Sequence, residues 1–366
     1  MWDQLSQCIA GGEGRVAFCI PWPNFIGGPT LAIYWYGILA SVGIFLGAWY
    51  ASKHVEAEGG DPDMVWDALL WLLIPALVGA RLWYVGQAVL AGSNDFAVTQ
   101  AADLLKIFNS RLGGMNIFGG GAFGLIALVF YARSRKIDGW LLADGALMGL
   151  LIGQGIGRLG NFINKELYGP PTGSTWFGIT IPADRRIGDY TDMTKYPPNT
   201  LFHPTMFYEM IWLFLCFGVI YYLFRRRQED FIHGLIAGFY LILAGFGRFW
   251  VEFLRLDQPS LPGSTIHYSQ ILALLYIAVG IVIVLDRWGY INTYAFFKVF
   301  FKNSPIDKPP TRRQRQQQYQ AIIADRRRQE RATEREKLRS ARRKVREASR
   351  KEPAAEPPPS EAAEES

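Results

Sequence analysis

The sequence predicts an all-α integral membrane protein with seven transmembrane helices, and three observations support this fold class. Half of the 366 residues are hydrophobic, and only 19% are charged. Residues 1–303 contain 21 basic and 21 acidic side chains, whereas residues 304–366 contain 17 basic and 11 acidic ones, which accounts for the whole net charge of +6. The first part also contains repeated apolar runs long enough to cross a hydrocarbon core of about 30 Å. A single water-soluble globule is therefore excluded.

The apolar runs divide the chain into seven predicted spans. In order they are Leu31–Ala51, Val65–Val89, Ile117–Ala132, Trp140–Gly157, Met206–Phe224, Leu235–Leu254 and Ile271–Leu285. The second span contains Arg81, the fourth Asp144, the fifth Glu209, and the sixth both Arg248 and Glu252. Charged side chains inside a bilayer face protein or water, so we expect these five to point away from lipid.

Basic residues between the spans predict the orientation, because Lys and Arg are retained on the cytoplasmic side. Residues 133–136 join spans three and four, residues 225–227 join spans five and six, and the basic tail follows span seven. All three lie on one side if there are seven spans. We therefore expect an external N-terminus, a cytoplasmic C-terminus and a long, irregular external connection over residues 158–203, in which Trp176–Ile181 could form a short strand.

The sequence divides into a membrane body, residues 1–303, and a charged cytoplasmic tail, residues 304–366. The tail contains few apolar residues and no coiled-coil pattern, which predicts a disordered or intermittently helical segment. Its basic part is expected to contact anionic membrane lipid. No motif for a specific nucleic acid is present, so the basic character of the chain belongs to this appendage.

The cysteines and histidines indicate neither a metal site nor a cofactor. Only three cysteines are present, and the four histidines do not have the spacing of metal ligands. Cys8 and Cys19 could form a disulfide bond if the N-terminus faces an oxidising compartment, or both could be free thiols.

The end of the fourth span combines a glycine strip with polar residues. Gly145, Gly149, Gly153 and Gly157 recur at every fourth position, which is typical of close helix packing. Arg158 follows directly, with Asn161 three residues later. A guanidinium and an amide at a membrane boundary can hold a phosphate group. The structural alternative is that Arg158 extends to the phosphates of bulk lipid.

The sixth span presents a second charged group. Arg248, Glu252 and Arg255 are spaced by four and three residues, so they lie on one helical face. Spans four and six run in the same direction, which places Arg158 and Arg248 at a similar depth. Two arginines at one depth predict a clamp for a phosphate group, although a purely structural pair between Arg248 and Glu252 is the alternative.

Several further residues are candidates near the same membrane surface. Tyr36 could line a site or belong to the aromatic belt of the interface. His203, Tyr208 and Glu209 begin the fifth span, where His203 could orient the preceding loop. Gly119 and Gly120, in a run of three glycines at the start of the third span, permit close approach of a ligand or of another backbone.

Five segments together resemble the bacterial prolipoprotein diacylglyceryl transferase family. The main one is Gly157-Arg-Leu-Gly-Asn-Phe-Ile-Asn-Lys-Glu-Leu-Tyr-Gly169, and the others are Trp35-Tyr-Gly37, Gly113-Gly-Met115, His203-Pro-Thr-Met-Phe-Tyr-Glu209 and Arg248-Phe-Trp-Val-Glu-Phe-Leu-Arg255. They occur in the family's order over residues ~30–287. The charged tail is not part of the resemblance.

The resemblance implies an enzyme of the bacterial plasma membrane with several membrane spans. Its members transfer a diacylglyceryl group from phosphatidylglycerol to the lipobox cysteine of a prolipoprotein signal peptide, and no cofactor is implied. Arg158 and Arg248 match the family's essential arginines, and with Glu252 they are the candidate catalytic residues. The implied substrate-binding positions are Arg158, Asn161, Glu166, Gly169, Tyr36, His203, Tyr208, Glu209, Gly119 and Gly120.

One position departs from the family pattern. Members commonly carry His in a Gly-Gly-Met-Ser-Phe-His-Gly-Gly segment, and Phe118 stands there in this chain. Phenylalanine cannot accept a proton. We therefore expect either that this His is not a required base or that the protein is impaired, and we favour the first reading. His267, further along the chain, could compensate.

Two other classes of function remain open from the sequence. A membrane transporter for an anionic solute could use the same arginines, although matching interrupted helices in two halves of the chain are not evident. An inactive family member that binds lipid or prolipoprotein is the reading that Phe118 would favour.

Overall fold

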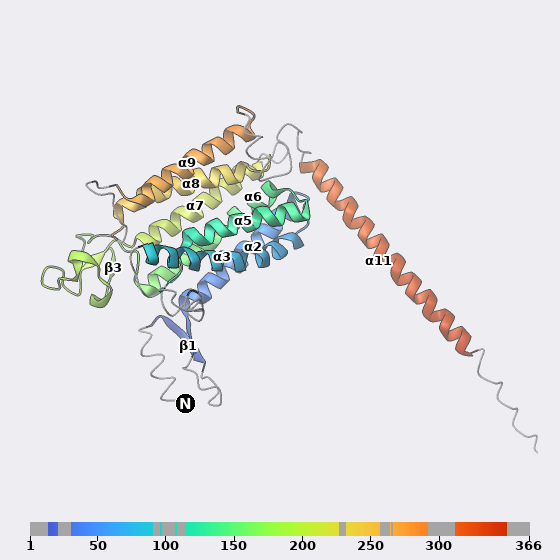
Figure 1. Ribbon diagram of the computed structural model, residues 1–366, viewed down its shortest axis with the longest axis horizontal. Coiled ribbons are helices and arrows are strands. Elements are labelled where there is room, and N and C mark those ends of the chain that lie inside the picture. Colours follow the sequence, from blue (N-terminus) through green and yellow to red (C-terminus); the bar gives the residue numbers. More distant parts are fainter. Residues whose placement is uncertain are drawn as a thin grey trace, which may run out of the picture. The chain divides into compact units, whose positions relative to one another are not determined.

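The computed structural model describes residues 14–20, 31–90, 96, 107, 114–226, 232–256, 264, 266–291 and 312–349. Two compact units divide the chain at Arg315. The first unit is a helical bundle, and Figure 1 shows its long helices lying side by side. The elements of this bundle are α2 (Trp35–Ala57), α3 (Asp63–Leu90), α5 (Ile117–Arg135), α6 (Gly139–Asn164), α7 (Thr205–Arg226), α8 (Leu235–Val251) and α9 (Tyr268–Arg287).

Helices long and apolar enough to cross a membrane form most of this bundle. Six meet that description among the described residues: α2, α3, α6, α7, α8 with the following short helix, and α9. Each overlaps a predicted span, and so does α5, which has 19 residues. The prediction of a helical membrane protein is confirmed. Helices suit this setting because they satisfy every backbone hydrogen bond within one segment.

Glycines allow α2 and α6 to pack with their backbones in contact. A Cβ atom on Gly47 would lie 2.6 Å from the carbonyl oxygen of Gly149, and one on Gly43 would lie 3.0 Å from that of Gly153. These distances are too short for a side chain, so the glycine strip of α6 serves close helix packing. The pairing places the start of α2 beside the end of α6.

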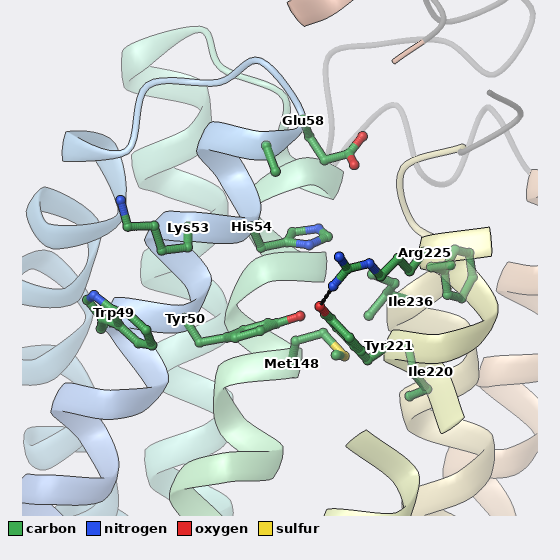
Figure 2. Close-up of a pocket in the computed structure, with 12 residues that line it drawn as sticks. Trp49, Tyr50, Lys53, His54, Glu58, Met148, Ile220, Tyr221, Arg225 and Ile236 are labelled. Carbon is green, nitrogen blue, oxygen red and sulfur yellow. Dashed lines mark hydrogen bonds between the residues drawn. The ribbon is translucent and has the colours of Figure 1, made fainter. Parts of the chain in front are cut away.

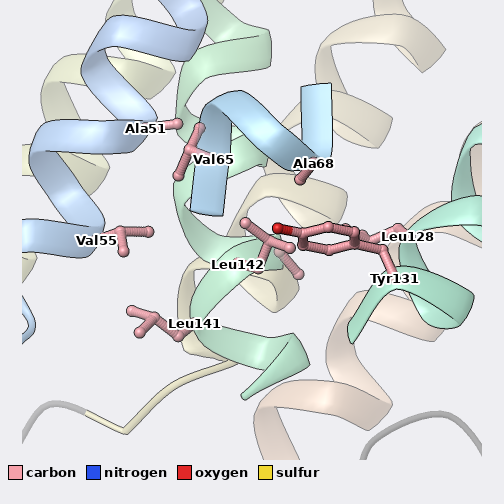
Figure 3. Packing of buried hydrophobic residues seen from close by; sticks show 9 residues of the cluster. Ala51, Val55, Val65, Ala68, Leu128, Tyr131, Leu141 and Leu142 are labelled. Atoms are coloured by element: carbon pink, nitrogen blue, oxygen red, sulfur yellow. The ribbon is translucent and has the colours of Figure 1, made fainter. Parts of the chain in front are cut away.

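A hydrophobic cluster joins four helices at the other end of this pair. Figure 3 shows Ala51 and Val55 of α2, Val65 of α3, Leu128 of α5 and Leu142 of α6 converging on one point. All five are buried. The cluster holds the α3 and α5 pair against the α2 and α6 pair.

The charged residues of spans two and four point into protein, as predicted. Arg81 donates to the carbonyl oxygens of Ile107 at 2.7 Å and Gly114 at 2.9 Å. Asp144 is fully buried and accepts hydrogen bonds from the backbone nitrogens of Gly234 at 2.6 Å and Ala237 at 2.8 Å. The carboxylate therefore caps the beginning of α8 and ties it to α6.

The connection between α6 and α7 is mostly irregular and contains only short elements. Strand β3 (Ile179–Thr180) pairs with β4 (Leu201–Phe202), and two short helices, η4 (Ala183–Arg185) and η5 (Gly188–Thr191), lie between them. The possible short strand within residues 176–181 is present. Buried Arg186 donates to the carbonyl oxygens of Ile181 at 2.9 Å and Pro197 at 3.1 Å, which holds this connection together.

A β-hairpin precedes the first helix. Strand β1 (Val16–Ile20) pairs antiparallel with β2 (Leu31–Tyr34), which runs directly into α2. Cys19 is disulfide-bonded, and Cys216 is a buried free thiol. Cys8, the partner considered in the sequence, lies outside the described residues.

The second unit contains most of α11 (Arg312–Ser349), a continuous helix of 38 residues. The composition predicts a disordered or intermittently helical tail over residues 304–366, and the structure describes a helix over residues 312–349 of it. Arg, Gln, Glu, Lys and Ala dominate this stretch and have high intrinsic helix propensity. Local pairs such as the 3.1 Å hydrogen bond from Gln329 to Asp325 also stabilise the helix.

Candidate active site: arginines and glutamates at one end of the bundle

The last turns of α6 carry the first part of the site. The helix ends where Lys165 adopts a left-handed conformation, with φ of 54°. One turn earlier, Nη1 of Arg158 donates to Oδ1 of Asn161 at 3.2 Å, and Nδ2 of Asn161 donates to Oε1 of Glu166 at 2.7 Å. Glu166 also accepts from Asn164 at 3.3 Å. This chain fixes the Asn161 amide, which in turn orients the Arg158 guanidinium.

Glu209 is the centre of the site. Pro204 precedes the first residue of α7, where its fixed φ suits a helix start, and Glu209 follows one turn later. The Glu209 carboxylate forms an ion pair with Arg158, and its Oε1 lies 3.5 Å from Nη1 of Arg248 and 3.8 Å from Nη1 of Arg255. One buried carboxylate thus brings together guanidinium groups from α6, α8 and the segment that follows α8.

Glu252 is the second carboxylate and lies where α8 changes into the short helix η6 (Glu252–Leu254). Its side chain is fully buried, with Oε2 3.1 Å from Nη2 of Arg248 and Oε1 3.8 Å from Nδ1 of His267. Arg248 therefore contacts both carboxylates. The ion pair between Arg248 and Glu252, which the sequence left open as the structural alternative to a phosphate clamp, is present. His267 at the start of α9 is brought to the same carboxylate.

Charge and exposure together indicate what this cluster can bind. Three guanidinium groups and two carboxylates leave a net positive charge. The side chains of Arg158 and Arg248 are 22% and 29% exposed, whereas Glu209 is 8% exposed and Glu252 is fully buried. Within this ion-paired group the carboxylates are less exposed than Arg158 and Arg248, so its accessible groups are guanidinium groups, with the exposed carboxylate of Glu166 beside them. A guanidinium pair in a region of low water content is suited to hold a phosphate group.

Further cations lie beside the end of α6. Nη1 of Arg185 donates to the carbonyl oxygen of Asn164 at 2.9 Å, and Nζ of Lys165 lies 4.1 Å from the centre of the Phe162 ring. Burial lowers the pKa of Lys165, and the neighbouring Arg185 charge lowers it further. Both side chains add positive potential around the cluster.

Tyr36, His203, Tyr208 and Gly169 occupy the same end of the bundle. A Cβ atom on Gly160 would lie 2.5 Å from the Tyr36 ring, so this ring packs directly on α6 at Gly160. Gly160 lies between Arg158 and Asn161 in the sequence. Nδ1 of His203 is 2.9 Å from the Tyr208 hydroxyl. The Gly169 nitrogen donates to the His203 carbonyl oxygen at 2.8 Å, which joins the external connection to the start of α7.

Gly119 and Gly120 are not brought into this cluster. Both face α3: Gly119 lies against the backbone of Gly79, and a Cβ atom on Gly120 would lie 3.4 Å from the carbonyl oxygen of Ala76. The glycines thus permit close approach of another backbone, which is one of the two readings that the sequence left open. The Phe118 side chain lies outside the described residues.

Sequence reasoning missed the roles of two residues. Arg255 was recognised only as the third charge on a helical face, and the structure makes it the third cation around Glu209. Gln270 is 2% exposed, and its Oε1 accepts a hydrogen bond from the backbone nitrogen of His267 at 2.9 Å. This bond fixes the start of α9 beside Glu252. The spacing of three residues between His267 and Gln270 is that of a capping box and could have indicated this contact.

Comparison with known proteins assigns the chain to a family. The profile of prolipoprotein diacylglyceryl transferase matches residues 23–285. The chain belongs to this family. The match covers the whole bundle except the last two residues of α9, and it leaves out the tail helix α11.

Individual members of this family align with 70–72% of this chain. A phosphatidylglycerol–prolipoprotein diacylglyceryl transferase from Enterococcus faecalis is 36% identical over 258 residues, which are 70% of this chain and 87% of the relative. Proteins of the same name from Chloroflexus aggregans and Synechococcus elongatus are 33% and 34% identical, over 71% and 72% of this chain and 87% and 86% of each relative. The resemblance stated from the sequence motifs is confirmed.

Proposed function

We propose that this transferase moves the diacylglyceryl group of phosphatidylglycerol to the lipobox cysteine thiol of a prolipoprotein, the first step of bacterial lipoprotein maturation. The names of the relatives support these two substrates. The observation that carries the proposal is the cationic surface formed by Arg158 and Arg248, with Glu209 and Glu252 buried behind it. Such a surface matches the phosphate of the lipid donor.

The reaction is a substitution at a glyceryl carbon. The cysteine sulfur forms a bond to that carbon, the carbon–oxygen bond to phosphate breaks, and glycerol phosphate leaves with the bonding electron pair. Negative charge moves from sulfur to the phosphate oxygens. Arg158 and Arg248 stabilise that charge where water is scarce, and Asn161 orients Arg158.

The thiol proton requires an acceptor, but not a strong base. A free cysteine with a pKa near 8.5 already contains some thiolate at neutral pH. Glu252, fully buried and 3.1 Å from Arg248, either fixes that arginine or takes the proton. This reading is compatible with Phe118 at the position where the family commonly has His.

We propose seven membrane spans with the cluster at the extracytoplasmic end. Helix α5 would be the additional span, since it lies among the six longer apolar helices (Figure 1). The disulfide bond of Cys19 supports an external N-terminus, because disulfides form in oxidising compartments. Arg225 and Arg226 end α7 and would then be cytoplasmic, as the retention of basic residues on that side requires. The membrane is the bacterial plasma membrane, with the basic part of the tail in contact with anionic lipid.

The proposed reaction is tested by mass spectrometry of a lipobox peptide after incubation with the purified protein and phosphatidylglycerol. We expect the mass of one diacylglyceryl group to be added. Arg158→Ala should abolish the product, and Arg158→Lys should restore little of it, because lysine lacks the two-pronged geometry. Arg133→Ala, in the last turn of α5, is the matched control and should remain active. An active Arg158→Ala variant would exclude the phosphate clamp.

A further inference from the structure

A cavity with both polar and apolar walls lies between α2 and α7, away from the active-site cluster. Its volume is about 380 Å³, and Met148 of α6, ten residues before Arg158, and Ile236 at the start of α8 complete its walls. Figure 2 shows side chains from these helices pointing into one space, with Tyr50 and His54 on one side and Tyr221 and Arg225 on the other. None of these four residues takes part in the proposed transfer reaction.

The cavity and the active-site cluster lie at opposite ends of the bundle. Glu209 and Arg225 are on the same helix, 16 residues apart. At 1.5 Å per residue, they are separated by about 24 Å along the helix axis. This distance approaches the thickness of a hydrocarbon core, about 30 Å. If the cluster lies at one membrane surface, the cavity lies near the other.

The polar groups that line the cavity include the Arg225 guanidinium, two tyrosine hydroxyls and the buried carboxylate of Glu58 at the end of α2. Nη1 of Arg225 donates to the Tyr221 hydroxyl, and the Arg225 guanidinium lies 5.5 Å from the centre of the same ring (Figure 2). The Tyr50 hydroxyl points toward this pair in Figure 2. Lys53 is at the rim, where its amine is 3.0 Å from Glu56.

The remaining wall of the cavity is apolar. Met148 of α6, Ile220 of α7 and Ile236 of α8 line it and are almost completely buried. Trp49 of α2 also lines it and is 51% exposed, on the outside of the bundle. A cavity with a cationic, hydroxyl-bearing side and an apolar side fits a molecule with both characters. Tryptophan and tyrosine at the end of a membrane helix are typical of the headgroup region.

We propose that this cavity binds the phosphate-bearing headgroup of an anionic phospholipid from the leaflet opposite the active site. Arg225 would pair with the phosphate, and the hydroxyl groups of Tyr50 and Tyr221 would donate to its oxygens. The apolar wall would contact the upper part of an acyl chain. This lipid is a bound ligand and is not consumed, so the proposal does not depend on the transfer reaction.

The test uses native mass spectrometry of the full-length protein in detergent, titrated with dioleoyl phosphatidylserine. Dioleoyl phosphatidylcholine tests the need for a net negative headgroup, and inorganic phosphate tests the need for a lipid. The variants are Arg225→Ala, Tyr50→Phe and the matched control Arg226→Ala, which removes the neighbouring cation. Arg226 does not line the cavity and instead lies 4.9 Å from the centre of the Tyr222 ring.

We expect Arg225→Ala to weaken the binding of one phosphatidylserine molecule about tenfold, because a charge-assisted contact is lost. Tyr50→Phe should weaken it less, and Arg226→Ala should leave it unchanged. All three variants should still lipidate a lipobox peptide, which shows that they are folded. If Arg226→Ala weakened phosphatidylserine binding as much as Arg225→Ala, the binding would depend only on general surface charge, and the proposal would be overturned. The proposal would also be overturned if phosphatidylcholine bound as tightly as phosphatidylserine, or if inorganic phosphate at the same concentration displaced the lipid.

Discussion

At the scale of single residues, Glu209 organises the active-site cluster. Its carboxylate contacts guanidinium groups from Arg158, Arg248 and Arg255, which come from different parts of the chain. The sequence indicated the arginines, because charged residues in apolar spans are conspicuous. It did not indicate that one carboxylate would serve all three, because that depends on how α6, α7 and α8 pack. In the proposed reaction, Glu209 is therefore a positioning residue for Arg158 and Arg248.

Replacement of Glu209 tests this role. Glu209→Gln keeps the size of the side chain but removes the charge, so the three guanidinium groups lose their common partner. A charge-assisted hydrogen bond contributes about 1.5–3 kcal/mol, so we expect kcat for peptide lipidation to fall at least about tenfold, with a smaller change in KM for phosphatidylglycerol. Asp67→Asn is the matched control, since Asp67 is exposed and 3.9 Å from Arg135. Wild-type kcat in Glu209→Gln would contradict the role.

At the scale of elements, the helices could be predicted closely, and their contacts only in part. Apolar runs located all seven helices of the bundle, because the bilayer requires long uncharged segments. The glycine strip of α6 indicated close packing. Its partner on α2 is formed by Gly43 and Gly47, which have the same four-residue spacing, but spacing alone does not say which two helices such glycines bring together. The contact matters for function, since it sets Tyr36 of α2 beside the polar end of α6.

A methyl group at this crossing tests the importance of the close approach. Gly149→Ala places a Cβ atom against the backbone of Gly47, so α2 and α6 must separate. Overpacking of this kind costs about 1–3 kcal/mol, and we expect a lower midpoint of thermal unfolding in detergent together with reduced lipidation. Gly121→Ala, on α5, is the control, because a Cβ atom added at that position would have no neighbouring atom within 4 Å. Equal midpoints for the two variants would show that the crossing tolerates a side chain.

At the scale of the whole molecule, the division into a membrane body and a charged tail follows from composition, and the conformation of the tail does not. Residues 304–366 hold 17 basic and 11 acidic side chains, which marks them as a separate segment. Low hydrophobicity suggested disorder or broken helix, whereas α11 is continuous. High helix propensity at nearly every position outweighs the lack of an apolar face.

Removal of the tail tests whether the body is sufficient for the reaction. The family profile ends at residue 285, and every residue of the active-site cluster lies in the first compact unit. Deletion of residues 311–366 should therefore leave peptide lipidation in detergent within about twofold of the full chain, since no group that would contact the phosphate is removed. Deletion of residues 350–366 alone is the control, because it keeps α11 and removes only the acidic, proline-rich end. Complete loss of activity with the longer deletion, and not with the shorter one, would place α11 in the mechanism.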